Sequence, residues 1–207
     1  MRTSFTTLIC LNGELPGEEF FREFDGRILA ADGAALALAG MGIRAHMVVG
    51  DMDSLSLREA RTIADEVVHS AEQDTNDFEK IFLHAKPEEL QGACICGFHG
   101  GDLEHTLNNW SVLMRYGKSH SPVVYDKGRL AVPVYETFTL ATEPEEIISL
   151  IPQPHARITT EGLRWALTNE ELRLGSREGA RNRSTGSSVR VEVHDGALLV
   201  FYDAHRS

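Results

Sequence analysis

The chain has 207 residues, of which 42% are hydrophobic and 25% charged, the balance of a soluble globular protein with one large domain or two small ones. Its 20 basic and 31 acidic side chains give a formal net charge of −11, which argues against general nucleic-acid binding because that requires a basic surface. The three cysteines form neither an even disulfide framework nor a zinc-ligand spacing, and the first apolar segment is too short for a signal peptide or a membrane span, so we expect a reduced, cytoplasmic protein.

Apolar runs alternate with amphipathic segments through the first half of the chain. Runs that end abruptly at glycine or polar residues are typical of buried parallel strands, and they predict strands at residues 8–11, 28–31, 47–49, 67–68, 93–96 and 123–125. Helical spacing or helix-forming composition predicts helices at residues 18–24, 34–39, 56–64, 77–85 and 104–116. Strand–helix alternation of this kind predicts an α/β domain with a doubly wound, mostly parallel sheet.

The sequence pattern changes near residue 130. Short strand candidates separated by Pro, Gly, Asn and Ser turns lie at residues 131–135, 136–140, 147–151, 157–160, 189–193 and 198–202. Apolar and polar residues alternate clearly in the candidate at 189–193. We therefore expect a smaller antiparallel β-sandwich domain at residues 129–207, after an α/β domain at residues 1–128.

Carboxylates follow three successive predicted strands of the first half. They are Asp32, Asp51, Asp53, Asp74 and Asp77. Because the carboxyl ends of neighbouring parallel strands meet at one edge of a sheet, we expect these side chains to lie close together and to repel one another. The Asp-x-Asp pair alone is more typical of a polar turn that starts a helix than of a metal site. The whole set favours Mg²⁺, which binds carboxylate oxygens, and phosphoryl-type transfer chemistry.

Other chemistries have weaker support in the sequence. There is no P-loop motif and no Gly-x-Ser-x-Gly elbow, and the nine histidines include no His-Glu-x-x-His pair. Gly100 and Gly101 precede a predicted helix and could offer backbone N–H groups to a phosphate, with His105 nearby. A tight turn is the equally consistent alternative for this glycine pair.

Five segments, taken in order, resemble the thiamine pyrophosphokinase family. They are Ala-Asp-Gly-Ala-Ala at 31–35, Gly-Asp-Met-Asp-Ser at 50–54, Gln-Asp-Thr-Asn-Asp-Phe-Glu-Lys at 73–80, Gly-Gly-Asp-Leu-Glu-His-Thr-Leu-Asn-Asn at 100–109 and Thr-Glu-Gly-Leu-Arg-Trp-Ala-Leu at 160–167. Arg181-Asn182 falls where the family commonly has Ser-Asn. The resemblance covers nearly the whole chain.

The resemblance implies ATP-dependent transfer of a pyrophosphoryl group to the hydroxyl of thiamine, which gives thiamine diphosphate and AMP. It implies a catalytic domain at 1–128 that binds ATP and Mg²⁺, and a thiamine-binding and dimerisation domain at 129–207. It also implies a homodimer whose active site is shared between chains.

The family's site residues carry over by motif position. The implied metal ligands are Asp32, Asp51, Asp53 and Asp77, and the implied catalytic residues are Asp51, Asp53, Asp77 and Glu104. We expect thiamine contacts from Gln73, Trp165 and Asn182, and nucleotide contacts from Asn12, Gly13, Gly100, Gly101 and His105. A core aromatic is the alternative for Trp165, and a turn residue is the alternative for Asn182.

The chain departs from the family pattern at several positions. Asp102 replaces an arginine, Glu104 an aspartate, Ala34 a glycine, Leu36 an asparagine and Arg181 a serine. These departures leave two alternatives open: a related pyrophosphokinase for another heteroaromatic alcohol, and a non-catalytic dimeric protein that binds thiamine or its diphosphate. The retained acids favour an enzyme, because a sensor needs no metal-directed carboxylates.

Overall fold

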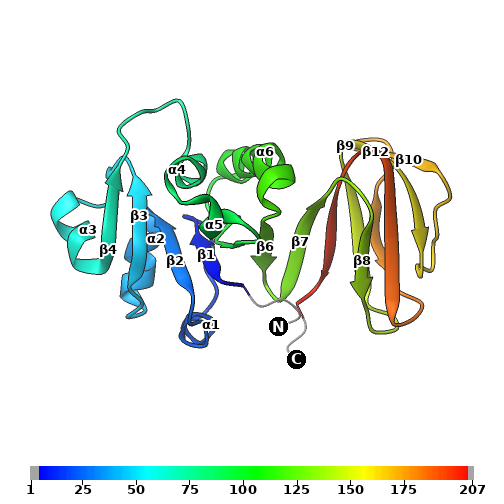
Figure 1. Ribbon diagram of the computed structural model, residues 1–207, viewed down its shortest axis with the longest axis horizontal. Coiled ribbons are helices and arrows are strands. Elements are labelled where there is room, and N and C mark those ends of the chain that lie inside the picture. Colours follow the sequence, from blue (N-terminus) through cyan, green and yellow to red (C-terminus); the bar gives the residue numbers. More distant parts are fainter. Residues whose placement is uncertain (1–4, 205–207) are drawn as a thin grey trace. The chain divides into compact units, whose positions relative to one another are not determined.

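A computed structural model describes residues 5–204, which fall into two compact units (Figure 1). The division lies between Lys127 and Gly128. No helix in the described part of the chain has the length and apolar character needed to cross a membrane.

The first unit contains a parallel sheet with the strand order β6-β5-β1-β2-β3-β4. Its strands are β1 (Thr7–Cys10), β2 (Arg27–Ala31), β3 (Ala45–Gly50), β4 (Ala64–His69), β5 (Cys94–Cys96) and β6 (Val123–Asp126). This confirms the predicted parallel sheet. The chain adds β2, β3 and β4 on one side of β1 and then returns to add β5 on the other side. The carboxyl ends of β1 and β5 therefore form a topological switch point, where ligands bind in open α/β sheets.

Helices connect these strands. They are α1 (Glu18–Arg22), α2 (Asp32–Gly40), α3 (Leu57–Ile63), α4 (Asp77–His84), α5 (Pro87–Leu90) and α6 (Leu103–His120). The short α5 was not expected from the sequence, because a single turn of four residues has no amphipathic period. The α3 helix begins with a reciprocal capping box between Ser56 and Glu59.

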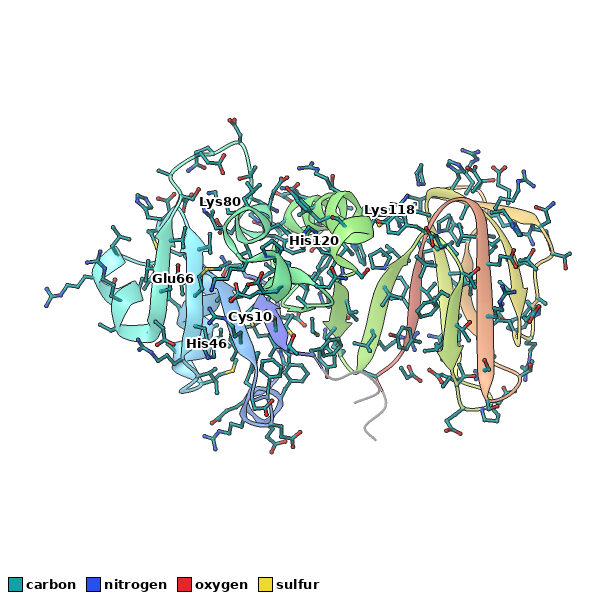
Figure 2. All side chains as sticks on the ribbon, viewed as in Figure 1. Cys10, His46, Glu66, Lys80, Lys118 and His120 are labelled. Atoms are coloured by element: carbon teal, nitrogen blue, oxygen red, sulfur yellow. The ribbon has the colours of Figure 1, made fainter. Side chains whose placement is uncertain are left out.

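Alternate strand residues pack on opposite faces of the sheet. Leu8, Ile28 and Val48 belong to one buried cluster with residues of α1, α2 and α3. Residues next to them in sequence, such as Ile9 and Leu29, point to the other face, because side chains alternate along a strand. There α4 contacts β2, β3 and α6 (Figure 1). The three cysteines, including Cys10 in β1 (Figure 2), are free and buried.

The second unit is antiparallel throughout its described strand pairs. Its strands are β7 (Arg129–Val134), β8 (Phe138–Ala141), β9 (Ile147–Glu161), β10 (Glu170–Arg173), β11 (Gly179–Arg183) and β12 (Ser188–Asp203). The predicted strands at 147–151 and 157–160 are parts of one long strand, β9, and those at 189–193 and 198–202 are parts of β12. The sequence did not predict β10 and β11, because Glu-Glu-Leu-Arg and Gly-Ala-Arg-Asn-Arg lack apolar alternation.

The two long strands each pair with different neighbours along their two halves. The first half of β9 pairs with β11 and its second half with β10, whereas the first half of β12 pairs with β8 and its second half with β7. Register shifts between Val193 and Leu198 interrupt the β9–β12 ladder, and bulges of this kind bend strands. This confirms the predicted antiparallel β-rich part and gives it the connectivity of a sandwich.

Candidate active site

The loops that follow β1 and β5 are joined by backbone hydrogen bonds. Leu11 N–H donates to the Cys96 carbonyl at 2.9 Å, and Gly13 N–H donates to the Gly97 carbonyl at 2.9 Å. A Cβ atom at Gly13 would lie 2.0 Å from the His99 carbonyl oxygen, so only glycine allows this close approach. The joined loops fix the backbone at the switch point of the sheet.

A cavity of about 400 Å³ lies at this carboxyl edge of the sheet. Its walls come from the segments after β1, β3, β4 and β5 and from the first turns of α4 and α6. They include Asn12, Gly13, Asp51, Gln73, Thr75, Asn76, Asp77, Lys80, Gly100, Gly101, Asp102, His105 and Asn109. The structure therefore brings together all five residues expected at the nucleotide and two of the expected acids. Glu104, Asp32 and Asp53 are not among its wall residues.

Asp51 is held in its ionised form. Gln73 Nε2 donates to its Oδ2 at 3.0 Å, and the Asp53 N–H donates to its Oδ1 at 3.1 Å. These bonds, the one from Gln73 above all, lower the pKa of the Asp51 carboxyl. Met52 lies between the two aspartates with a φ of 65°, and this tight turn leaves the Asp53 side chain exposed.

Asp77, the first residue of α4, has the opposite character. Burial and, to a smaller extent, the charges of Asp32 and Asp51 raise the pKa of its carboxyl to about 6, while Lys80 opposes the shift. Lys80, on the same helix (Figure 2), is 2% exposed, and its Nζ lies 3.6 Å from Asp77 Oδ1. Three carboxylates and one buried lysine therefore interact at the ends of β2, β3 and β4.

The raised pKa of Asp77 predicts how stability depends on pH in the metal-free protein. Between the ordinary aspartate value near pH 4 and about pH 6, the folded carboxyl holds its proton more tightly than the unfolded one. The folded state then binds more protons, so stability falls as pH rises through this window, by up to about 2 kcal/mol. Chemical unfolding of wild type and Asp77→Asn in EDTA measures this slope, which the variant should lack. Equal slopes in the two proteins would contradict the assignment.

Asp32 is buried at the start of α2, with 1% of its surface exposed. Its Oδ1 accepts the Gly33 N–H at 2.6 Å, while its Oδ2 is buried without a hydrogen-bond partner among the described residues. A Cβ atom at Gly50 would lie 2.9 Å from the Asp32 Cγ, so the end of β3 closes tightly over this carboxylate.

The residues at this edge suit a hard divalent cation. Within residues 5–204, no three His, Cys, Asp or Glu side chains already converge as a metal site. However, the donors are carboxylate oxygens, one of them is buried without a partner, and their mutual repulsion would be relieved by a cation. This donor set fits Mg²⁺.

Sequence reasoning gave no role to several residues of the cavity. Asn76 Oδ1 caps α4 by accepting the Glu79 N–H at 2.9 Å, and Asn76 Nδ2 donates to Asn109 Oδ1 at 3.1 Å. Asn109 Nδ2 in turn donates to the Phe98 carbonyl at 3.0 Å, which ties α6 to the loop after β5. Lys80 is the last residue of the family-like segment at 73–80, and this position in the motif is the sequence feature that could have identified it as a site residue.

Trp165 and Asn182 belong to the second unit, where they contact each other. Trp165 is 58% exposed, which excludes its interpretation as a core aromatic. Asn182 lies in β11 rather than in a turn and is buried. Its Nδ2 donates to the Trp165 carbonyl at 2.8 Å.

Comparison with known proteins bears on both units. A family model described as the catalytic domain of thiamin pyrophosphokinase matches residues 22–125, and one described as its vitamin B1 binding domain matches residues 137–198. The chain is 27% identical over 158 residues to thiamin pyrophosphokinase 1 of Caenorhabditis elegans, which covers 70% of this chain and 64% of the relative. It is 28% identical over 172 residues to thiamine pyrophosphokinase 1 of Arabidopsis thaliana, covering 74% and 63%. The matched part thus spans less than two thirds of these relatives' length.

Solved structures show the same fold. A thiamine pyrophosphokinase from Bacillus subtilis superposes with a TM-score of 0.78 at 22% identity, covering 97% of this chain and 100% of that one. Yeast thiamin pyrophosphokinase gives 0.75 at 17% identity, covering 97% and 86%. Because both domain models match in order and the first alone covers half of the sequence, the chain belongs to the thiamin pyrophosphokinase family.

Proposed function

We propose that the protein transfers the pyrophosphoryl group of ATP to the hydroxyl of thiamine and releases AMP. The observation that carries this proposal is the cavity at the switch point, where Asp51, Asp77 and buried Lys80 face the glycine loops after β1 and β5. A site built from acids, one lysine and close backbone suits a bound polyphosphate better than it suits covalent catalysis. Membership of the family supplies thiamine as the acceptor.

We propose Asp32, Asp51, Asp53 and Asp77 as the residues that hold Mg²⁺. The bound ion would neutralise charge on the phosphates. Gln73 keeps Asp51 ionised and oriented through its hydrogen bond. Lys80 places a positive charge in the cavity wall, where it attracts phosphate oxygens.

In the reaction, the hydroxyl oxygen of thiamine forms a bond to the β-phosphorus of ATP. The bond from this phosphorus to the α–β bridging oxygen breaks, and AMP leaves with that oxygen. The hydroxyl proton passes to a carboxylate or to water. We propose Asp77, a carboxylate in the cavity wall, as the residue that orients the hydroxyl or accepts its proton.

Incubation of the protein with thiamine, ATP and Mg²⁺ tests the proposal. The expected products are thiamine diphosphate and AMP in equal amounts. Thiamine monophosphate with ADP would overturn pyrophosphoryl transfer. Turnover only with another heteroaromatic alcohol would support the related-kinase alternative, and thiamine binding without any turnover would support the non-catalytic one.

Glu104 should contribute moderately. It is exposed and outside the cavity wall, although its motif position implies a catalytic role. We expect Glu104→Gln to lower kcat by about tenfold or less, because loose phosphoryl transition states need little early proton removal. Steady-state kinetics measure this. Complete inactivation with unchanged thiamine and ATP binding would show that Glu104 acts directly in the reaction.

Asp102 should weaken nucleotide binding. It is the N-cap of α6, makes no capping hydrogen bond with its side chain and lines the cavity, where it would repel phosphates. We expect Asp102→Arg to lower the KM for ATP by about tenfold, since each charge change at an exposed site contributes about 0.5–1 kcal/mol. Asp102→Asn should give about half of this effect in free energy. An unchanged or higher KM in both variants would contradict a phosphate site beside Asp102.

We also propose that the protein is a cytoplasmic homodimer whose site combines both chains. The cytoplasmic location rests on the three free, buried cysteines. The dimer rests on the family resemblance, and analytical ultracentrifugation tests it directly.

A further inference from the structure

Trp165 is an exposed aromatic side chain on the segment between β9 and β10. More than half of it is open to solvent, although large apolar side chains are usually buried. Two sets of contacts nevertheless hold it, one at its backbone and one at its ring.

The backbone contact comes from Asn182. Its Oδ1 accepts the Trp165 N–H at 3.2 Å and the Arg183 N–H at 2.8 Å, and its Nδ2 donates to the Trp165 carbonyl at 2.8 Å. The register of β11 shifts just before Asn182, and Arg181 there has a φ of 57°. A bulge changes the direction of the side chain that follows it. Asn182 is only 6% exposed, and the three hydrogen bonds above largely occupy the donor and acceptor groups of its amide.

The ring contact comes from Arg164. Its guanidinium carbon lies 5.8 Å from the centroid of the Trp165 ring, within the range of a cation–π interaction. The guanidinium donates to Glu145 Oε1 at 2.5 Å, and Arg183 donates to the Glu145 carbonyl at 3.0 Å. Glu145 thus keeps Arg164 against one face of the indole.

We propose that Asn182, Arg164 and Glu145 form a brace that holds Trp165 in a fixed orientation, with one ring face covered by Arg164 and the other free to stack on a flat ligand ring. The inference rests on the proposed function for the identity of that ligand, thiamine. Asn182 is then a positioning residue that acts through Trp165 and not a ligand donor. Fixing an exposed side chain in advance lowers the entropic cost of binding, so the brace should act on affinity.

The first test measures the ring without any ligand. The chain has two tryptophans, so protein labelled with 5-fluorotryptophan gives two ¹⁹F signals, which Trp165→Phe assigns. In Arg164→Met the Trp165 signal should shift and narrow as the ring becomes mobile, while the Trp110 signal stays unchanged. Arg164→Lys should restore part of the wild-type signal. Arg177→Met is the matched control, because Arg177 makes a comparably exposed ion pair with Glu170.

The second test measures thiamine kinetics. Arg164→Met and Glu145→Gln should raise the KM for thiamine about three- to thirtyfold with kcat within about twofold, since a cation–π contact and its support have modest energies. Asn182→Asp keeps the acceptor oxygen, loses the bond to the Trp165 carbonyl and should have a similar effect. Full wild-type affinity in Arg164→Met and Glu145→Gln would overturn the brace.

The two tests separate the possible failures. A raised KM in Arg164→Met with an unchanged Trp165 signal would show that Arg164 touches the ligand directly, which also overturns the brace. If the protein does not act on thiamine, the proposed function fails, whereas the fluorine signals still decide whether the brace exists. If Asn182→Asp does not fold, the Arg164 and Glu145 variants decide.

Discussion

Replacement of Asp51 by Asn should lower kcat/KM by at least about a hundredfold, because the site would lose one of the carboxylates proposed to hold Mg²⁺, and with it the cation that would neutralise charge on the transferred phosphates. Asp51 lines the cavity, accepts hydrogen bonds from Gln73 and from the Asp53 backbone, and has a lowered pKa. Its carboxylate is thus ionised and oriented before any ligand binds. Steady-state kinetics at saturating Mg²⁺ measure the loss.

Asp74→Asn is the matched control for this prediction. Asp74 lies three residues before the first residue of α4, is exposed and does not line the cavity, so the activity of Asp74→Asn should stay within about threefold of wild type. Circular dichroism and the melting temperature show whether each variant folds. Near-normal activity in Asp51→Asn would reject its role, and equal losses in both variants would point to a general charge effect.

A mixture of Asp51→Asn and Trp165→Ala chains should regain activity that neither variant has alone. In a random mixture of dimers, half are mixed, and each mixed dimer has one site with both native parts if the site is shared. About a quarter of the wild-type activity should therefore return. The physical reason is that a phosphate site made of acids offers no platform for a flat ring, whereas an exposed indole does.

Subunit exchange must be shown independently, for example by energy transfer between chains labelled with different dyes. If the chains exchange and activity stays absent, each site is built within one chain. An alternative control pairs Asp51→Asn with Asp77→Asn. These two residues line the same cavity of the first unit, so this mixture should regain nothing.

The sequence predicted the strands of the first unit well, because short apolar runs that end at glycine or aspartate have few other interpretations. It divided β9 and β12 into shorter strands, because Pro152, Pro154 and Gly196 resemble turn residues. In the structure the strands continue through these positions, with register shifts in the β9–β12 ladder on either side of Gly196. Pairing with distant strands decides whether a strand continues through such residues, and no local sequence pattern predicts that pairing.

The presence of Asp51 and Asp77 at one edge of the sheet was also predictable, because both follow strands and parallel strands end together. Their different states were not. Asp51 is held ionised by Gln73 and Asp77 has a raised pKa through burial, although both are aspartates in short polar segments. Lys80 matters to the site because it is buried beside these acids, and the sequence does not show that burial. The hydrogen bond from the Asn182 amide to the Trp165 carbonyl joins residues 17 positions apart in the chain. Such differences arise only from packing.

The central claim is transfer of an intact pyrophosphoryl group from a nucleotide bound at the switch-point cavity. ATP labelled separately in its α or γ phosphate tests this claim most directly, in wild type and in Asp51→Asn. We predict that wild type moves the γ label into thiamine diphosphate and leaves the α label in AMP, and that Asp51→Asn does neither. Recovery of the γ label in thiamine monophosphate or free phosphate, with the α label in ADP, would contradict the account.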